Sequence, residues 1–512
     1  NLTFSYEWMN SESYGWIKKS TILNSGLINA TIKVVDGIQN ILPYGVQRTM
    51  QGMLSTLVDA YKKSELIEES GLALFRLSSI PVDKAEPSEA LKATTVWSIV
   101  EGNKKILLSN NQLDAFRRGE DIFTENETRG IKGSYYINHE IDLNQNEYHS
   151  WYIIADVSKD SSDIVDLLKV ISSQENLIQK INKDVNDGTK SLKELVCKAD
   201  GSVNSSNTNE IWRHFSNTMF NIMRGGIPKD EYKIQIADYK RHLSHFNKNA
   251  SIQNEEWINA LPDTIDYQEL ISKAYQNGDP DLIRLSTEYM PFIFSRRHGD
   301  PSRPWNLFNI KLKNSDGTPL LYYQGNWRDI FQNWEALAYS YPGFAFGMIF
   351  KFLNTSTIEG YNPYKVTSEG FEWEILDPSD PWSNIGYWGD HQIIYLEKLL
   401  ELMDKFFPGK LQDMMHQDIF TFANVPYKLK PYQDILKSPK ETILFDEEEN
   451  KRIEDLVNQI GENGKFLRYE NDIFRSNFSV KVLIPLLTKL SNFIPGAGIW
   501  MNTQRPEWND AN

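Results

Sequence analysis

The hydrophobic pattern changes near residue 160, and this change divides the chain into parts that cannot share one type of fold. Before it, short runs of β-branched and aromatic residues, such as residues 72–77, 134–138 and 151–155, are separated by glycine and asparagine. Runs at this spacing predict the antiparallel strands of a β-sandwich. After it, apolar residues recur every three or four positions, which indicates amphipathic helices. The sequence therefore predicts a β-sandwich over residues 1–160 and helices beyond it.

The helical part is expected to contain two sections, which makes the whole chain a multidomain β plus α protein. Residues 161–290 are predicted to form a helical linker, and residues 291–512 the first part of an (α/α)6 barrel. A hairpin is expected to turn at Asp316-Gly317, whereas residues 46–66 fit a helix or a strand equally well. Five helices are predicted in the last section: 327–339, 344–353, 386–406, 447–460 and 480–493.

Charge, hydropathy and cysteine content exclude several functions. Lys plus Arg number 54 and Asp plus Glu 69, a net charge of −15, so a nucleic acid is not an expected partner. No apolar run reaches the roughly 18 residues of a membrane-spanning helix. Cys197 is the only cysteine, which excludes a disulfide framework and a Cys-rich zinc site. His242 and His245 have a spacing found in metal sites, but no acidic partner set accompanies them, so a solvated surface is predicted there.

The two ends of the sequence bear on where the protein is found. The chain begins with Asn1 rather than Met, inside a strand-like run, and stops at Asn512 without a recognisable terminus. We therefore expect an internal fragment of a longer protein. A cytoplasmic location is the expectation, with the question of a signal peptide left open because the true N-terminus is not part of the sequence.

Aromatic residues and acids occur together in four segments of the later part of the chain. These segments are residues 295–306, 323–329, 387–392 and 505–510. Flat aromatic faces with charged groups at their rim suit sugar rings, which present apolar C–H faces and hydroxyls. Taken singly, each aromatic residue would more often belong to a core, and each acid would more often cap a helix. Four such segments in one helical region favour a common pocket.

Three of these segments resemble motifs of the cellobiose and chitobiose phosphorylase family. Gly325-Asn-Trp-Arg-Asp329 resembles its Gly-x-Arg-Asp signature, Tyr387-Trp-Gly-Asp-His-Gln392 its second acidic helix start, and Glu507-Trp-Asn-Asp510 its Asp-Trp-Asn-Asp motif. The order of β-sandwich, helical linker and (α/α)6 barrel is similar as well. Glu507 stands where the family has Asp, and 510 − 329 gives a long interval of 181 residues between the outer motifs. These departures indicate a distant, larger relative.

The resemblance implies roles for the matched residues only. Asp510 corresponds to the general acid, and Asp329 to the acid that holds hydroxyls of the non-reducing sugar, with Arg328 beside it. The other substrate-binding candidates implied are Asp390, Glu507, Trp508, Asn509, Arg297 and Arg303. No metal is expected among them.

The activity that the resemblance implies is inverting phosphorolysis of a β-glucosidic bond in a disaccharide or oligosaccharide, which gives an α-sugar 1-phosphate. An inverting glycoside hydrolase on the same barrel would use the same acid, with water and a second carboxylate in place of phosphate. A non-catalytic carbohydrate-binding protein is a third alternative. The expected partners are a β-linked oligosaccharide and inorganic phosphate as co-substrate, without a cofactor, nucleic acid or membrane; a homodimer stays open.

Overall fold

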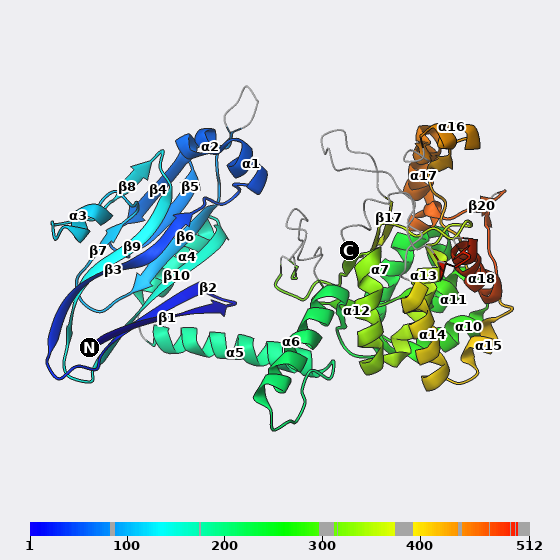
Figure 1. The fold of residues 1–512 in the computed structure, drawn as a ribbon, viewed down its shortest axis with the longest axis horizontal. Coiled ribbons are helices and arrows are strands. Elements are labelled where there is room, and N and C mark those ends of the chain that lie inside the picture. Colours follow the sequence, from blue (N-terminus) through cyan, green and yellow to red (C-terminus); the bar gives the residue numbers. More distant parts are fainter. Residues whose placement is uncertain are drawn as a thin grey trace. The chain divides into compact units, whose positions relative to one another are not determined.

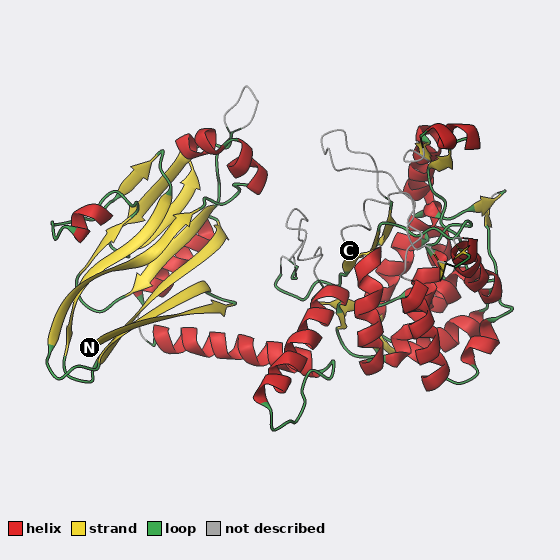
Figure 2. Cartoon of the chain, viewed as in Figure 1, coloured by secondary structure: helices red, strands yellow, loops and turns green. Residues whose placement is uncertain are grey.

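The computed structural model describes residues 1–81, 88–173, 176–295, 312–314, 316–373, 393–438, 443–470, 472–491, 493–496 and 498–499. The chain divides into two compact units, Asn1–Glu194 and Leu195–Asn512. The first unit consists mainly of strands and the second mainly of helices (Figures 1 and 2). The predicted change from β-structure to helices along the chain is therefore confirmed.

The first unit contains two antiparallel sheets. The larger has the strand order β1-β2-β10-β6-β5-β4-β8, and the smaller β3-β9-β7. The strands are β1 (Leu2–Ser11), β2 (Gly15–Asn24), β3 (Ala30–Ile41), β4 (Lys62–Ile67), β5 (Leu72–Leu77), β6 (Ala93–Ile99), β7 (Lys104–Leu107), β8 (Glu127–Arg129), β9 (Gly133–Leu143) and β10 (Tyr148–Lys159). The ambiguous residues 46–66 hold two short helices, α1 (Arg48–Met53) and α2 (Ser55–Tyr61), and most of β4; α3 (Leu113–Arg117) follows β7.

A shared core joins the two sheets. Phe75 and Trp151 of the larger sheet pack with Tyr135 and Ile137 of the smaller one, and all four side chains are buried. Asp36 of β3 reaches across this core and accepts a hydrogen bond of 2.8 Å from the indole Nε1 of Trp151. Because a buried carboxylate needs such partners, this contact helps to fix how the sheets face each other.

Helices cover the opposite face of the larger sheet. α4 (Ser161–Ser172) and the start of α5 (Leu177–Cys197) pack apolar side chains against Trp97 and Ile154. The pattern change near residue 160 is the beginning of α4, where Asp160 accepts hydrogen bonds from the backbone of Ser162 and Asp163. The backbone N–H of Asp160 in turn donates a hydrogen bond to the side-chain carboxylate of Asp163, so the two residues form a capping box.

His139 lies inside the sandwich and is held in its neutral form. Its side chain packs edge-on against Trp151, with 5.0 Å between ring centroids, and the residue is 4% exposed. Neither ring nitrogen has a hydrogen-bond partner among the described residues. Burial, helped by the nearby charge sites of His149 and Lys104 and opposed by Asp36, lowers the pKa of His139 to about 4.

We expect the first unit to lose stability in acid because of His139. In the unfolded chain His139 binds a proton below its usual pKa of about 6.5, whereas in the folded state it stays neutral down to its lowered pKa of about 4. The free energy of unfolding therefore falls as the pH drops from about 6.5 toward 4. The loss at about pH 4.5 should reach about 2–3 kcal/mol. Urea unfolding at neutral and acid pH should show a weaker pH dependence in His139→Phe than in the wild type. The same dependence in both proteins would refute this origin, and His214→Phe, which alters a partly buried histidine of the second unit, serves as the control.

The second unit is built mainly from helices. They are α6 (Thr208–Gly225), α7 (Ile236–Phe246), α8 (Lys248–Gln253), α9 (Glu255–Asn259), α10 (Tyr267–Asn277), α11 (Pro280–Glu288), α12 (Trp327–Ser340), α13 (Ala345–Asn354), α14 (Ile393–Phe406), α15 (Lys410–Met414), α16 (Tyr432–Lys437), α17 (Glu447–Ile460) and α18 (Phe478–Ser491). The helices predicted beyond residue 326 agree with α12, α13, α14, α17 and α18, although residues 386–392 lie outside the described part. The described helices do not by themselves define a closed ring, so the (α/α)6 barrel is still a proposal.

Short strand pairs connect these helices. β11 (Ile227–Pro228) pairs with β14 (Phe292–Ile293), β12 (Lys233–Gln235) with β13 (Thr264–Asp266), and β15 (Gln324–Asn326) joins β16 (Lys365–Thr367) and β17 (Gly370–Glu372). The remaining pairs are β18 (Tyr427–Leu429) with β19 (Ile443–Phe445), β20 (Arg468–Tyr469) with β21 (Asp472–Ile473), and β22 (Phe493–Ile494) with β23 (Gly498–Ile499). Two 3-10 turns, Pro342–Phe344 and Glu462–Lys465, complete the unit.

Helix α11 lies at the centre of the second unit. It starts at Pro280, after Asp279 caps the helix by accepting a hydrogen bond of 2.9 Å from the Asp281 backbone. Every residue from Asp281 to Glu288 is buried, including the charged ones. A helix that is enclosed on all sides must pair its polar groups inside the protein, and most of those of α11 do so, although Nε of Arg284 has no hydrogen-bond partner among the described residues.

Candidate functional site

Two of the predicted site residues, Arg328 and Asp329, lie in the first turn of helix α12. The others lie outside the described residues: Arg297, Arg303, Asp390, Glu507, Trp508, Asn509 and Asp510. The expected convergence of Asp329, Asp390 and Asp510 on one cavity therefore stays a prediction.

The start of α12 follows directly from strand β15. Gly325 pairs with Val366 of β16, and the Trp327 backbone donates a hydrogen bond of 2.8 Å to the carbonyl of Tyr364. A Cβ atom on Gly325 would lie 2.9 Å from the Cβ of Ile330, which is too close. The glycine of the Gly-Asn-Trp-Arg-Asp segment is thus required for the strand to turn tightly into the helix, and Asp329 is placed in the first turn, where the helix dipole favours a negative charge.

Two tryptophans of α12 anchor the helix rather than facing a ligand. Trp327 and Trp334 are 1% and 0% exposed. The indole Nε1 of Trp334 donates a hydrogen bond of 2.8 Å to the carbonyl of Gly225, and Trp327 packs on Phe331 with ring centroids 4.6 Å apart. For these two residues the role in the core, which is the more frequent one for a single aromatic residue, is therefore the observed one.

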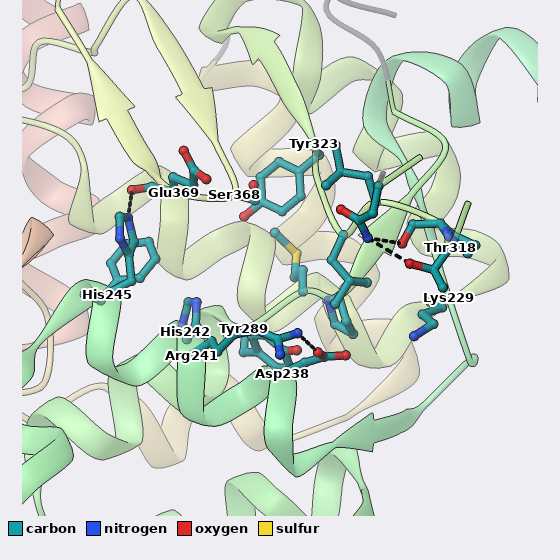
Figure 3. A pocket seen from close by; sticks show the side chains of 17 residues that line it. Lys229, Asp238, Arg241, His242, His245, Tyr289, Thr318, Tyr323, Ser368 and Glu369 are labelled. Atoms are coloured by element: carbon teal, nitrogen blue, oxygen red, sulfur yellow. Dashed lines mark hydrogen bonds and ion pairs between the residues drawn. The ribbon is translucent and has the colours of Figure 1, made fainter. Parts of the chain in front are cut away.

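The second unit contains a cavity of about 590 Å³ (Figure 3). One of its lining residues, Tyr323, precedes the Gly325–Asp329 segment in the sequence. Helix α7, residues 289–291 directly after α11, Asn314, residues 318–321 and residues 368–369 contribute to its walls. The lining residues are Lys229, Asp238, Arg241, His242, His245, Phe246, Tyr289, Met290, Pro291, Asn314, Thr318, Pro319, Leu320, Leu321, Tyr323, Ser368 and Glu369.

One wall of the cavity is the turn predicted at Asp316-Gly317. The Asn314 backbone donates to the Thr318 carbonyl at 2.9 Å, and the Gly317 backbone donates to the Asn314 carbonyl at 3.0 Å. Gly317 has a φ of +82°, a conformation that glycine adopts without strain. The Asn314 amide also donates to the hydroxyl of Thr318 at 3.0 Å. The predicted turn is confirmed, and it holds two polar side chains at the cavity wall.

His242 lines the cavity and is partly buried, so the predicted solvated surface holds for the exposed His245 but only in part for His242. Its ring lies 4.5 Å from that of Phe246 and 4.9 Å from that of Tyr289. Its Nε2 donates a hydrogen bond of 3.2 Å to the carbonyl of Leu285, because a carbonyl can only accept. Burial, followed by the charge of Lys351, lowers the pKa of His242 well below its usual value. The ring is therefore neutral, with Nδ1 left as a hydrogen-bond acceptor.

His245, one helical turn after His242 on α7, makes a different contact. Its Nε2 donates a hydrogen bond of 2.9 Å to the backbone carbonyl of Glu369. This bond ties α7 to the segment between β16 and β17, which forms the opposite side of the cavity (Figure 3). The two histidines thus have separate roles, and the described residues contain no group of three or more His, Cys, Asp or Glu side chains that could hold a metal.

The ionisable side chains of the cavity balance in formal charge. Asp238 and Arg241 form an ion pair within one turn of α7, and Lys229 and Glu369 contribute one charge of each sign. Tyr289 is 6% exposed, and its hydroxyl has no hydrogen-bond partner among the described residues. Burial, followed by the charge of Asp238, raises the pKa of Tyr289, so the hydroxyl keeps its proton.

Comparison with models of known protein families gives a match within the second unit. Residues 229–291 match the family model described as glycoside hydrolase family 149 insertion domain 1. This part of the chain is therefore similar to a domain of carbohydrate-active enzymes. The match names family 149 rather than the cellobiose phosphorylase family that the short motifs resemble, although both concern glycosides. No curated protein matches the chain.

The matched segment and the cavity overlap. Residues 229–291 include α7 and α11 and supply one side of the cavity, from Lys229 to Pro291. Sequence reasoning missed these residues because none of them lies in a motif with acids and aromatics close together. A usable signal was present in the spacing of Asp238, His242 and His245, which lie on one side of a helix. No helix among the described residues is long and apolar enough to cross a membrane.

Proposed function

We propose that the protein is a glycoside phosphorylase that cleaves a β-glucosidic bond with inorganic phosphate and inverts the anomeric carbon. The observation that carries this proposal is the match of residues 229–291 to an insertion domain of glycoside hydrolase family 149. The Gly325-Asn-Trp-Arg-Asp329 segment supports it, because its glycine is required for the strand-to-helix turn that places Asp329.

In the proposed reaction one bond breaks and one forms at the anomeric carbon. Asp510 donates its proton to the leaving glycosidic oxygen, while a phosphate oxygen attacks the opposite face of the sugar. The products are an α-sugar 1-phosphate and a shortened sugar. Asp329 and Arg328 hold the hydroxyls of the sugar that is transferred. Asp510 must carry a proton at working pH, and Glu507, three residues away, is the candidate neighbour that raises its pKa.

We expect the full-length protein to release sugar 1-phosphate from β-linked glucose oligosaccharides only when inorganic phosphate is present. β-1,3- and β-1,4-linked oligosaccharides are incubated with and without phosphate, and sugar 1-phosphate and reducing ends are both quantified. Equal release of reducing ends without phosphate would identify an inverting hydrolase instead. Binding of an oligosaccharide without any turnover would identify a carbohydrate-binding protein.

A further inference from the structure

We propose that the cavity beside α7 binds one neutral sugar ring, with Nδ1 of His242 accepting a hydrogen bond from a sugar hydroxyl. The sugar is a free monosaccharide or one unit of an oligosaccharide. The ligand class rests on the proposed function, whereas the site itself rests on the geometry of the described residues.

The size and walls of the cavity fit a sugar ring. About 590 Å³ lies within the range of roughly 300–1,000 Å³ that small-molecule sites occupy. Leu320 and Leu321 contribute partly exposed aliphatic side chains, and the largely buried Phe246, Tyr289 and Tyr323 contribute the small parts of their rings that reach the cavity. Such walls pack against the C–H faces of a pyranose, which a purely polar cavity would not favour.

The charge balance of the cavity selects a neutral ligand. The acid Asp238 is occupied by Arg241, and Lys229 is matched in formal charge by Glu369. A phosphate or another anion would gain little from a site whose formal charges cancel, because removing an ion from water needs a matching charge in return. Neutral hydroxyls can bond to either sign of charge and to the side chains of Asn314, Thr318 and Ser368.

Two groups in the wall have hydrogen-bonding capacity that the described residues do not use. Because Nε2 of His242 is committed to the Leu285 carbonyl, Nδ1 is a fixed acceptor and cannot become a donor while the ring is neutral. The buried Tyr289 hydroxyl, without a partner in the described parts of the chain, is a donor. A buried hydroxyl without a partner is unfavourable, so a ligand hydroxyl that reaches it stabilises the complex.

The test measures binding by titration calorimetry on the full-length protein, with glucose, a β-linked hexasaccharide and inorganic phosphate as probes. His242→Phe retains an aromatic ring that can pack on Phe246 and Tyr289, but it removes both ring nitrogens. Loss of one hydrogen bond should weaken sugar binding about fivefold to tenfold. His214→Phe is the matched control, because His214 also bonds a carbonyl through Nε2, that of Asp200, beside a separate hollow of about 280 Å³. It should leave binding unchanged.

A second variant keeps the test decisive if His242→Phe folds poorly. Leu320→Trp enlarges a side chain of the opposite wall and should reduce sugar binding by filling the cavity. If the variants bind both glucose and the hexasaccharide more weakly, the cavity binds a free monosaccharide. If they bind only the hexasaccharide more weakly, the cavity binds one sugar unit of an oligosaccharide. Either result supports the proposal. Unchanged sugar binding in both variants, or a loss of phosphate binding in both variants with sugar binding unchanged, would overturn it.

Turnover separates this proposal from the proposed function. Sugar binding that depends on His242, in a protein that shows no phosphorolysis, would leave the cavity assignment standing and reject the phosphorylase. Phosphorolysis in a protein whose sugar binding is unchanged by both variants would support the phosphorylase and reject the cavity as a sugar site.

Discussion

Replacement of Arg284 by methionine is expected to destabilise the second unit by about 3–5 kcal/mol, because it removes one charge from a buried ionic group. Arg284 is 0% exposed and lies between two acids of its own helix: its Nη2 is 3.4 Å from Asp281 and its Nη1 is 3.5 Å from Glu288. Nη2 also donates a hydrogen bond of 2.8 Å to Asn463, and the guanidinium lies 5.0 Å from the ring centre of Phe466.

The cost arises from what the substitution leaves behind. Glu288 retains a hydrogen bond of 2.5 Å from the Asn354 amide, and Asp281 retains its ion pair of 3.0 Å with Arg475. Glu288 still loses its ion pair with Arg284 while its side chain stays buried, and the nearby charge of Lys351 compensates that loss only in part. Urea unfolding of the second-unit signal measures the effect.

Arg452→Met is the matched control for this substitution. Arg452 forms an ion pair with Glu449 on helix α17, and its side chain is 54% exposed. Exposed pairs contribute about 0–1 kcal/mol, so this variant should unfold almost like the wild type. Adding Glu288→Gln to Arg284→Met should recover part of the lost stability, because the unpaired charge is then removed. A loss below about 1 kcal/mol in Arg284→Met would contradict the role assigned to this group.

Helix positions could be predicted because their signals are local. Helix α17 coincides with the predicted span 447–460, since Asp446 caps it by accepting a hydrogen bond from the Glu449 backbone. The start of α11 has the same kind of local signal, the capping Asp279 followed by Pro280. The strands of the first unit could be predicted from alternation and turn residues. Each of these features depends on residues a few positions apart, so one sequence contains enough information.

The direction in which a helix faces could not be predicted. Helix α18 was expected from its apolar residues, yet in the second unit it buries Lys481 and Lys489 and leaves Leu483, Leu487 and Leu490 about half exposed. The ammonium of Lys481 lies 3.8 Å from the ring centre of Phe422, a contact between distant parts of the chain. Periodicity reveals that a helix has two sides, but only the tertiary contacts decide which side is covered.

The candidate site shows the same limit. The sequence marks which residue types can do chemistry, and Asp329 is placed at a helix start as expected. It does not reveal burial, so it leaves open whether Trp327 belongs to the core or faces a ligand, and it does not indicate that His242 lines a cavity. Both questions are decided by contacts between residues that are far apart in the sequence, such as His242 with Leu285 and Tyr289.

Replacement of Asp510 by asparagine is expected to lower the rate of phosphorolysis by about 10²–10⁴-fold, because asparagine cannot protonate the leaving oxygen. The effect should fall on kcat, with little change in KM, since the proton is transferred only in the transition state. Phosphate-dependent release of sugar 1-phosphate from a β-linked oligosaccharide measures it. Asp434→Asn, at an exposed acid in the first turn of α16, is the control and should retain full activity.

The leaving group distinguishes an acid catalyst from a residue that only shapes the site. A β-glucosyl fluoride needs far less protonation to depart than a sugar does, so Asp510→Asn should cleave the fluoride with phosphate at nearly the wild-type rate while it fails on the oligosaccharide. Glu507→Gln should keep the oligosaccharide reaction but shift its basic limb to lower pH, because removing a neighbouring negative charge lowers the pKa of the acid. Equal losses on both substrates in Asp510→Asn would show that Asp510 positions the sugar and that the proton comes from another group.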